Sequence, residues 1–322
     1  MLVPHSMSGK TVGILGLGLS GMAAAHALAA AGATCWLHDD GRAAPDDLPA
    51  NAIPAHWQDW PWDGLDAMVI SPGIPHDLPV PHPAAARALA ADVEIISEIE
   101  LAMRAAPKAR LVAITGTNGK STTTALIGHC LRTAGIAVSV GGNIGDAACN
   151  LDDAGPDGVI VLELSSYQLE TTPSLHADVA LLLNITPDHL DRHGGMDGYV
   201  AAKAHILSAL PPHGLAVFGE GDGPVGQLAA DFLARGGTAV TVSADDLPTD
   251  GNLSPALAGP HNAINAAAAA ACLRHLGVSE ADIAAGMGDF AGLPHRMQHV
   301  AQHEGVAFIN DSKATNGVAA AC

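Results

Sequence analysis

The chain has 322 residues, of which 48% are apolar and 15% are charged, so it can bury a large core and form roughly two or three domains. Its 14 lysines and arginines are outnumbered by 33 aspartates and glutamates, which gives a formal net charge of −19. This charge argues against a nucleic-acid partner or an anionic membrane surface, because both need a positive protein surface. Phosphate ligands stay possible, since backbone N–H groups and a few local cations can hold them.

The cysteines indicate a reduced, cytoplasmic protein rather than a disulfide or zinc framework, because they are scattered and form no C-x-x-C pair. They are Cys35, Cys130, Cys149, Cys272 and Cys322. The apolar stretch after Lys10 resembles a secretory signal peptide, but four glycines interrupt it and the same residues fit a strand, a turn and a helix. Polar residues interrupt every apolar run of about 18 residues, so we expect no membrane span.

The first elements along the chain predict a parallel sheet. Residues 11–15 are typical of a buried strand, GLGLSG of a turn, 21–31 of an Ala-rich helix and 33–38 of a second strand. A strand, a helix and a strand in this order form a βαβ unit.

The turn in this unit has the glycine spacing of a dinucleotide site. It reads Gly16-x-Gly18-x-x-Gly21, and an acid follows at Asp39 or Asp40, near the spacing expected of a ribose partner. Because sheets of this topology hold many nucleotide ligands, a nicotinamide-dependent oxidoreductase stays open from this motif alone.

Later apolar runs predict further strands and helices. A strand at 67–70 runs into Ser71-Pro72-Gly73, and a helix begins around 95–105, so we place the first domain boundary just before that helix. The remaining expected strands are 111–114, 158–162, 178–184, 215–219, 238–242, 298–302 and 305–309, and the remaining expected helices are 121–134 and 261–276.

A second glycine-rich turn lies at residues 115–120, between a buried strand and a helix. It contains Gly116-x-x-Gly119-Lys120-Ser121, which is shorter than the strict G-x-x-x-x-G-K-[ST] phosphate loop. Backbone N–H groups of such a turn converge on phosphate oxygens, the lysine adds a mobile charge, and the serine hydroxyl can bind Mg²⁺. The position between strand and helix favours a phosphate loop over a simple turn.

Acidic and histidine side chains follow two of the buried runs. Glu163 comes at the end of 159–162, and Asp188 and His189 lie just past 178–184. Ligands gather at the carboxyl ends of strands in open α/β sheets, and a carboxylate beside a phosphate loop suits Mg²⁺. Lys203 lies in a short helical stretch, and its residue type alone predicts a solvated side chain.

Ten strings in register resemble the Mur ligases, from about residue 11 to residue 316: GLGLSG, SPGI, TGTNGKST, GGNIG, ELSSYQLE, NITPDHLDRH, YVAAK, HNAIN, LPHR and NDSKATN. The resemblance implies an ATP-dependent ligase that adds D-glutamate to UDP-N-acetylmuramoyl-L-alanine through an acyl phosphate. That reaction serves peptidoglycan synthesis, and with it the cell wall, cell shape and cell division. It also implies that the first glycine turn holds the UDP of the substrate rather than a dinucleotide.

The resemblance assigns residues to each ligand. Lys120, Glu163, His189 and Lys203 are the implied catalytic residues, and Ser121, Glu163, His189 and Lys203 the implied ligands of two Mg²⁺ ions, with Lys203 as a carbamate. The implied ATP-binding residues are Gly116, Thr117, Asn118, Gly119, Lys120, Ser121, Thr122, Asn262, Asn265, Arg296, Asp311 and Lys313. The implied substrate contacts are Leu19, Ser20, Asp39, Ser71, Gly73, Asn143, His189 and Thr315, and Asp40 competes with Asp39.

We therefore expect an α/β protein with a Rossmann-like UDP-sugar domain at 1–96, a P-loop-type ATPase domain at 97–296 and the start of a third α/β domain at 297–322. The last range is too short to bury a core of its own, so we expect a truncated third domain and little turnover. We also expect a cytoplasmic monomer. The alternatives are a folylpolyglutamate-type ligase, which should lack the GLGLSG domain, and a non-catalytic UDP-sugar or nucleotide binder.

Overall fold

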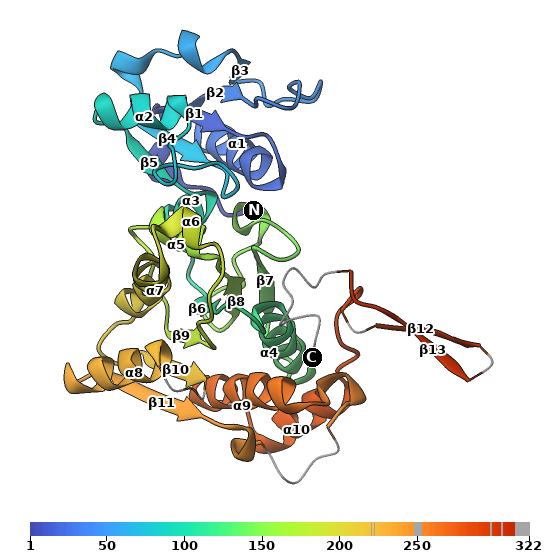
Figure 1. Ribbon diagram of the computed structural model, residues 1–322. Coiled ribbons are helices and arrows are strands. Elements are labelled where there is room, and N and C mark those ends of the chain that lie inside the picture. The colour runs from blue at the N-terminus through green and yellow to red at the C-terminus, as the bar shows by residue number, and fades with distance from the viewer. Residues whose placement is uncertain (220, 222, 248–252, 297, 304, 313–322) are drawn as a thin grey trace.

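The computed structural model describes residues 1–322 except 220, 222, 248–252, 297, 304 and 313–322. The first sheet lies at the top of Figure 1 and consists of five parallel strands in the order β3-β2-β1-β4-β5. Their bounds are β1 Thr11–Leu15, β2 Thr34–His38, β3 Ala52–Pro54, β4 Ala67–Ile70 and β5 Glu94–Ile96, and the helices between them are α1 Leu19–Ala31 and α2 Pro83–Ala90.

The second sheet is parallel as well and has six strands in the order β11-β10-β9-β6-β8-β7. The strands are β6 Arg110–Thr115, β7 Val138–Gly142, β8 Val159–Glu163, β9 Val179–Leu182, β10 Leu215–Gly219 and β11 Thr238–Val242. The helices are α3 Glu98–Arg104, α4 Lys120–Thr133, α5 Ser166–Glu170, α6 Leu190–His193, α7 Met196–Ala204, α8 Pro224–Ala234, α9 Pro260–His275 and α10 Glu280–Asp289.

A two-stranded antiparallel hairpin follows, formed by β12 Gln298–His303 and β13 Val306–Asn310, and it projects from the rest of the molecule (Figure 1). The short 3₁₀ helices are η1 His5–Met7, η2 Trp57–Asp59, η3 Trp62–Gly64, η4 Ala148–Asn150, η5 His205–Ala209, η6 Ala244–Asp246 and η7 Pro255–Leu257. In the described part of the chain, no helix is both long and apolar enough to cross a membrane.

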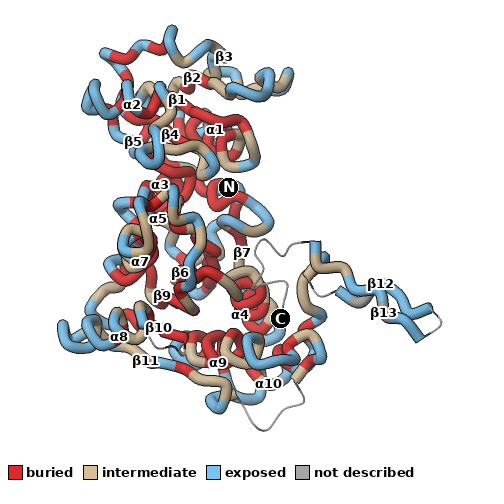
Figure 2. The backbone as a smooth tube through the Cα atoms, in the orientation of Figure 1, coloured by how far each residue is buried: buried red, intermediate tan, exposed pale blue. Residues whose placement is uncertain are grey.

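Small side chains allow the helices to pack closely on the second sheet. In α9, the run Ala266–Ala270 is between 0% and 1% exposed, and α4 and α10 pack beside it on the same face. A Cβ at Gly286 of α10 would lie 2.8 Å from the Cys130 sulfur of α4. Figure 2 shows this buried layer in red between the helices. One further buried cluster covers the opposite face and continues through α3 into α1 and β1.

The parallel-sheet prediction is confirmed for both halves of the chain, with most expected strand and helix bounds within a residue or two. The helix expected around 95–105 is wrong at its start. Residues 94–96 instead pair with β4 as a strand, and Ser97 caps α3 by accepting from the Glu100 N–H. The strand β7 was not predicted. The division at 96/97 and 296/297 stays a prediction, although each of the first two ranges contains one sheet.

A buried carboxyl group at the start of α3 has one oxygen without a hydrogen-bond partner in the part of the chain that the structure describes. Glu98 is 2% exposed; its Oε1 accepts from the Cys149 N–H, and its Oε2 has no hydrogen-bond partner among the described residues. Burial raises the pKa of Glu98 from 4.5 to about 7. The folded protein therefore holds a proton on Glu98, over this pH range, that the unfolded chain releases.

This pKa difference predicts that the free energy of unfolding falls as the pH rises from 4.5 to 7, by an amount on the order of 3 kcal/mol. Glu98→Gln cannot ionise, so we expect it to lack this fall. Denaturant unfolding at several pH values measures the difference, with exposed Glu280→Gln as the control. Equal slopes in the wild type and Glu98→Gln would contradict the buried-carboxyl argument.

Candidate active site

The loop at residues 116–119 connects β6 to α4 and is fixed by one asparagine. The Asn118 N–H donates to Asn184 Oδ1 at 2.8 Å, and Asn184 Nδ2 donates back to the Asn118 carbonyl at 3.0 Å. The Thr117 N–H donates to the Asn184 carbonyl at 2.9 Å. Because Asn184 follows β9, two neighbouring strands of the sheet together set the shape of the loop. The helix that follows has no side-chain cap, and uncapped N-terminal N–H groups can donate to an anion.

Gly119 brings α9 against this loop. Its φ of +83° is the left-handed conformation, and an added Cβ would lie 2.2 Å from Asn265 Oδ1. Asn265 is 5% exposed and donates to Asn262 Oδ1 at 3.3 Å, and Asn262 donates to the Ala258 carbonyl at 3.1 Å. The structure therefore brings together the loop and the two asparagines that the sequence predicted.

Two lysine amines meet on one carbonyl oxygen of the loop. Lys120 Nζ donates to the Gly116 carbonyl at 2.9 Å, and Lys203 Nζ donates to the same oxygen at 2.8 Å. Lys120 also donates to the Thr117 carbonyl at 2.9 Å. A carbonyl has two lone pairs and accepts both bonds, but two ammonium groups so close repel each other.

Burial shifts both amines toward the neutral form, and repulsion from Lys120 adds to the shift of Lys203. Lys203 is 2% exposed, and burial followed by repulsion from Lys120 lowers its pKa from 10.5 to about 7. Burial also lowers the pKa of Lys120, with Glu163 opposing that shift and Arg296 adding to it. The expectation of a solvated Lys203 is wrong, because α7 turns this side chain into the sheet. This positive loop lies in a strongly acidic chain and is suited to a polyphosphate.

A buried carboxylate lies beside the loop. Glu163 ends β8, is 2% exposed, and accepts at Oε1 from Asn143 Nδ2 at 2.8 Å, whereas its Oε2 is buried with no partner among the described residues. An unpartnered buried carboxylate oxygen is costly unless a cation binds it. Oxygen ligands are the ones that Mg²⁺ takes, so the site fits that ion.

The other predicted metal ligands are less closely grouped. No group of three or more His, Cys, Asp and Glu side chains in the described ranges is arranged to hold a metal. His189 has φ +51° at the start of α6, its side chain is 53% exposed, and its Nδ1 lies 3.7 Å from Asp188 Oδ1. Asp188 is close enough to oppose the fall in the pKa of Lys203. Ser121 lies in the first turn of α4.

Arg296 reaches the loop from the far side, since its Nη1 donates to Thr122 Oγ1 at 3.5 Å. Asp311 directly follows β13, and its place at the ATP stays a prediction. Lys313 and Thr315 lie outside the described residues.

The first glycine turn is held by two side chains from neighbouring strands. Ser71 Oγ donates to the Gly16 carbonyl at 3.1 Å, and a Cβ at Gly16, where φ is +92°, would lie 2.6 Å from that hydroxyl. Asp39 accepts from the Leu17 N–H at 2.7 Å, and this bond is the main reason that the pKa of Asp39 is lowered. Predicted contact Leu19 is 80% exposed at the start of α1.

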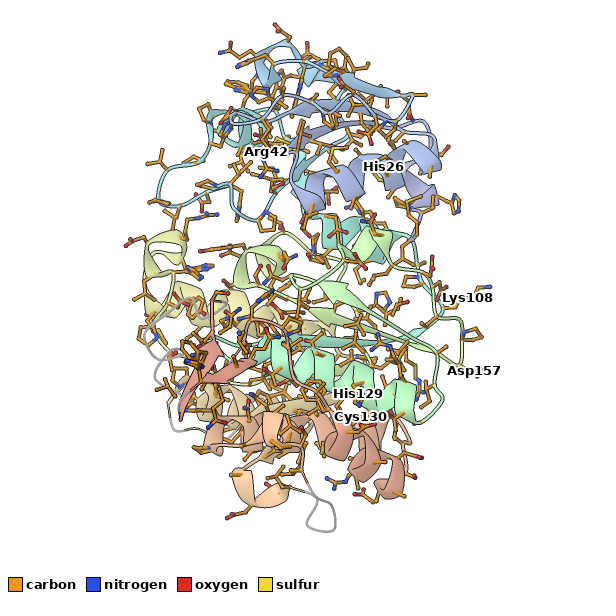
Figure 3. All side chains as sticks on the ribbon, turned by 90° about the vertical axis from the view of Figure 1, so that its right-hand side faces the viewer. His26, Arg42, Lys108, His129, Cys130 and Asp157 are labelled. Carbon is orange, nitrogen blue, oxygen red and sulfur yellow. The ribbon has the colours of Figure 1, made fainter. Side chains whose placement is uncertain are left out.

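The two competing aspartates have different partners. Asp40 lies between His38 Nε2 and His82 Nε2, each at 2.9 Å, and does not contact the turn through these bonds. Asp39 instead borders a cavity of about 210 Å³ beside the turn, which Leu37, Arg42 and His56 also line. Figure 3 labels Arg42 beside the first sheet. Asp39 is therefore the acid at the turn, although its ligand contact stays a prediction.

The sequence analysis missed several residues that shape these sites. Asn184 carries a signal like that of Glu163, a polar residue at the carboxyl end of an apolar run, and could have been found by it. Tyr199 could not, because its place depends on the tertiary packing of α7. It is 1% exposed, and its hydroxyl lies 3.1 Å from Thr117 Oγ1.

Comparison with known proteins gives consistent matches. Residues 114–250 match the model of the Mur ligase middle domain. The UDP-N-acetylmuramoylalanine–D-glutamate ligase of Paramagnetospirillum magneticum is 46% identical, over 96% of this chain and 72% of that protein. The enzyme of the same name from Rhodospirillum rubrum is also 46% identical, over 99% of this chain and 73% of that protein.

A solved structure shares the fold. It is the UDP-N-acetylmuramate:L-alanyl-gamma-D-glutamyl-meso-diaminopimelate ligase of Neisseria meningitides, with a TM-score of 0.59 and 19% identity. The match covers 89% of this chain and 99% of that one.

The contact between Gly119 and Asn265 predicts a steric cost at this loop. Gly119→Ala and Gly135→Ala both place alanine at a positive φ, but only Gly119 has a neighbour within 4 Å. We expect Gly135→Ala to lower the free energy of unfolding by about 1–2 kcal/mol, and Gly119→Ala by roughly 1–3 kcal/mol more. Denaturant unfolding of both variants measures the difference, and equal losses would show that Asn265 does not constrain the loop.

Proposed function

The chain belongs to the Mur ligase family, and we propose on this basis that it is an ATP-dependent ligase that adds D-glutamate to UDP-N-acetylmuramoyl-L-alanine in peptidoglycan synthesis. The observation that carries the proposal is the presence of two separate glycine-rich turns, each at the carboxyl end of its own parallel sheet. A dehydrogenase would use the first turn and leave the second without a role. A folylpolyglutamate-type ligase would use the second and leave the first.

In this proposal the first turn holds the UDP-sugar. Support comes from the cavity beside Asp39, which has room for a nucleoside base, and from the exposed Leu19 and half-buried Ser20 at the start of α1. Ser71 and Gly73 follow β4, and Ser71 donates to the Gly16 carbonyl of this turn. The N-terminus of α1 then faces the diphosphate. Asn143 and His189 are proposed to meet the lactoyl-alanine end.

The second turn is proposed to hold ATP. Lys120 leaves its two loop carbonyls to meet the β- and γ-phosphates, and Asn262, Asn265 and Arg296 bind the rest of the nucleotide, with Asp311 and Lys313 as further proposed contacts. Mg²⁺, proposed as two ions, would neutralise phosphate charge from ligands Ser121, Glu163, His189 and Lys203.

In this chemistry the chain aligns the substrates and neutralises their charge, and it forms no covalent bond to them. The alanyl carboxylate attacks the γ-phosphorus, an acyl phosphate forms and ADP leaves; the D-glutamate amine then attacks the acyl carbon and phosphate leaves. Lys120 and the N-terminus of α4 oppose the charge that develops on the γ-phosphate. The burial of the loop keeps bulk water from competing for the acyl phosphate.

Lys203 is proposed to act as a carbamate. A neutral amine attacks CO₂, a C–N bond forms, and one proton is released, so a cation becomes an oxygen ligand. The lowered pKa of Lys203 supplies the neutral amine near pH 7. A negative group at this place would also relieve the repulsion between Lys203 and Lys120.

The surroundings of the reaction follow from the same proposal. We propose that the protein acts as a monomer in the cytoplasm, without nucleic acid or membrane as a partner; the buried thiols of Cys35, Cys130, Cys149 and Cys272 are consistent with a reducing compartment.

Phosphate release with Mg·ATP and UDP-N-acetylmuramoyl-L-alanine, measured with D-glutamate, L-glutamate or neither, tests the proposed function. The proposal expects that D-glutamate and not L-glutamate stimulates the release, and that the rate is low, because the chain spans only 72% of the length of the relative from Paramagnetospirillum magneticum. Binding of both nucleotides without stimulation would instead identify a non-catalytic binder, and stimulation by L-glutamate would identify a folate-type ligase.

The two-turn arrangement predicts separable losses of binding. Lys120→Ala should weaken Mg·ATP binding at least about tenfold, because it removes the cation at the β/γ-phosphates. The affinity for the UDP-sugar should stay within about twofold, since that ligand occupies the other turn. Calorimetric titration of each ligand measures both constants, with exposed Lys108→Ala, labelled in Figure 3, as the control. Equal loss of both affinities would contradict the assignment of two sites.

A carbamate on Lys203 predicts a specific ¹³C NMR signal. After incubation with ¹³C-bicarbonate, the wild type should show a carbamate carbon signal in ¹³C NMR, and this signal should grow as the pH rises through about 7, because the Lys203 amine loses its proton there. Lys203→Arg should lack the signal, and Lys108→Arg should keep it. A signal that persists in Lys203→Arg would place the carbamate elsewhere.

A further inference from the structure

Both tyrosines of this aromatic-poor chain lie in one column of rings, in which one pair is stacked and the other is tilted by 46°. The sequence contains 2 tyrosines, Tyr167 and Tyr199, and the ring of His193 lies between them. Tyr167 stacks on His193 with ring centroids 5.2 Å apart and an interplanar angle of 13°, and His193 lies 5.3 Å from Tyr199. All three residues lie in motifs that also contain proposed site residues, but the proposed chemistry gives these three side chains no role.

The centre of the column is locked by hydrogen bonds. The His193 side chain is fully buried; its Nε2 lies 2.9 Å from Ser166 Oγ and its Nδ1 2.9 Å from Glu170 Oε1. Ser166 and Glu170 are the first and last residues of α5, whereas His193 ends α6. The column therefore cannot rotate or slide without breaking these bonds.

The column reaches the second glycine turn at one end and, through Arg192, the loop at residues 71–74 at the other. At one end the Tyr199 hydroxyl lies 3.1 Å from Thr117 Oγ1 in the second turn. At the other end the Arg192 guanidinium lies 4.4 Å from the Tyr167 ring centroid. Arg192 then donates from Nη1 to the Gly73 carbonyl at 3.2 Å and from Nη2 to the Ile74 carbonyl at 3.3 Å.

We propose that Arg192 is a positioning residue for the loop at residues 71–74, and that the ring column holds it at a fixed place relative to the ATP turn. Both Arg192 bonds go to backbone carbonyls, so they fix the course of the loop and leave the Ser71 side chain to the first turn. The planar guanidinium reaches two carbonyls while it lies on a ring, which a lysine cannot do.

The inference deepens the proposed function, because residues 71–74 border the turn proposed to hold the UDP-sugar. In-line attack on the γ-phosphate needs the two ligands at a set distance, and small displacements are costly. A stack of rigid rings has few internal degrees of freedom, so it keeps that distance better than a flexible loop would.

Hydrogen exchange of the full chain without ligand tests the structural part. Arg192→Met and Tyr167→Leu should each speed exchange of the Ser71, Gly73 and Ile74 amides by about tenfold, because the loop loses its two anchoring bonds or the ring beneath Arg192. Tyr167→Phe keeps the ring and should exchange like the wild type. Arg87→Met is the matched control, since Arg87 also lies over a ring, that of Trp62, at 4.9 Å, but does not bond this loop.

Binding measurements test the functional part. Arg192→Met and Tyr167→Leu should each weaken binding of UDP-N-acetylmuramoyl-L-alanine about tenfold, and the double variant should show the same loss rather than the product of the two, because Tyr167 acts through Arg192. The affinity for Mg·ATP should stay within about twofold in all of them.

The outcomes separate the inference from the proposed function. Unchanged exchange in Arg192→Met and Tyr167→Leu overturns the positioning role, whatever the ligand proves to be. Faster exchange in the two variants, together with a wild-type chain that does not bind the UDP-sugar, supports the positioning role and contradicts the proposed function. Multiplied losses in the double variant show that Tyr167 contacts the ligand itself and overturn its role through Arg192. A lower melting temperature with unchanged exchange and affinity shows a general structural role only.

Discussion

Two amines on one carbonyl oxygen are the constraint around which this site is built. Lys120 and Lys203 both donate to Gly116, and one of them is almost fully buried. Like charges at this separation are tolerated only when one amine is neutral or an anion lies nearby. Burial lowers the pKa of both lysines, and repulsion from Lys120 lowers that of Lys203 further. A polyphosphate at the turn, or a carbamate on Lys203, would each relieve the repulsion between the two amines. The free protein therefore already favours both.

The rest of the fold holds the two lysine amines at this carbonyl oxygen. The parallel strands β6, β8 and β9 end side by side, which brings the turn, Glu163 and Asn184 to one edge. Small residues in α4, α9 and α10 let those helices approach closely enough for Asn265 to touch Gly119. The first sheet repeats the arrangement at Gly16 with Ser71 and Asp39 as its supports. The contact of Arg192 with Gly73 then connects the two edges.

Local motifs were readable from the sequence, and distant contacts were not. The second glycine turn, the strands around it and the placement of Glu163 at a strand end follow from hydrophobic runs and glycine spacing, which are local signals. The burial of Lys203 has no local signal, because it depends on how α7 packs against the sheet. The choice between Asp39 and Asp40 needed the turn in three dimensions, since adjacent residues on a strand end point to different partners. The ring column could not be predicted from the sequence either, because it depends on the tertiary packing of distant residues.

The most direct measurement is a crystal structure of the chain with UDP-N-acetylmuramoyl-L-alanine and a magnesium complex of a non-hydrolysable ATP analogue. The account predicts the uridine in the cavity beside Asp39, the analogue's γ-phosphate at Lys120, and the alanyl carboxylate between the two turns. An adenine nucleotide or NAD bound at the first glycine turn, or a γ-phosphate away from Lys120, would contradict it.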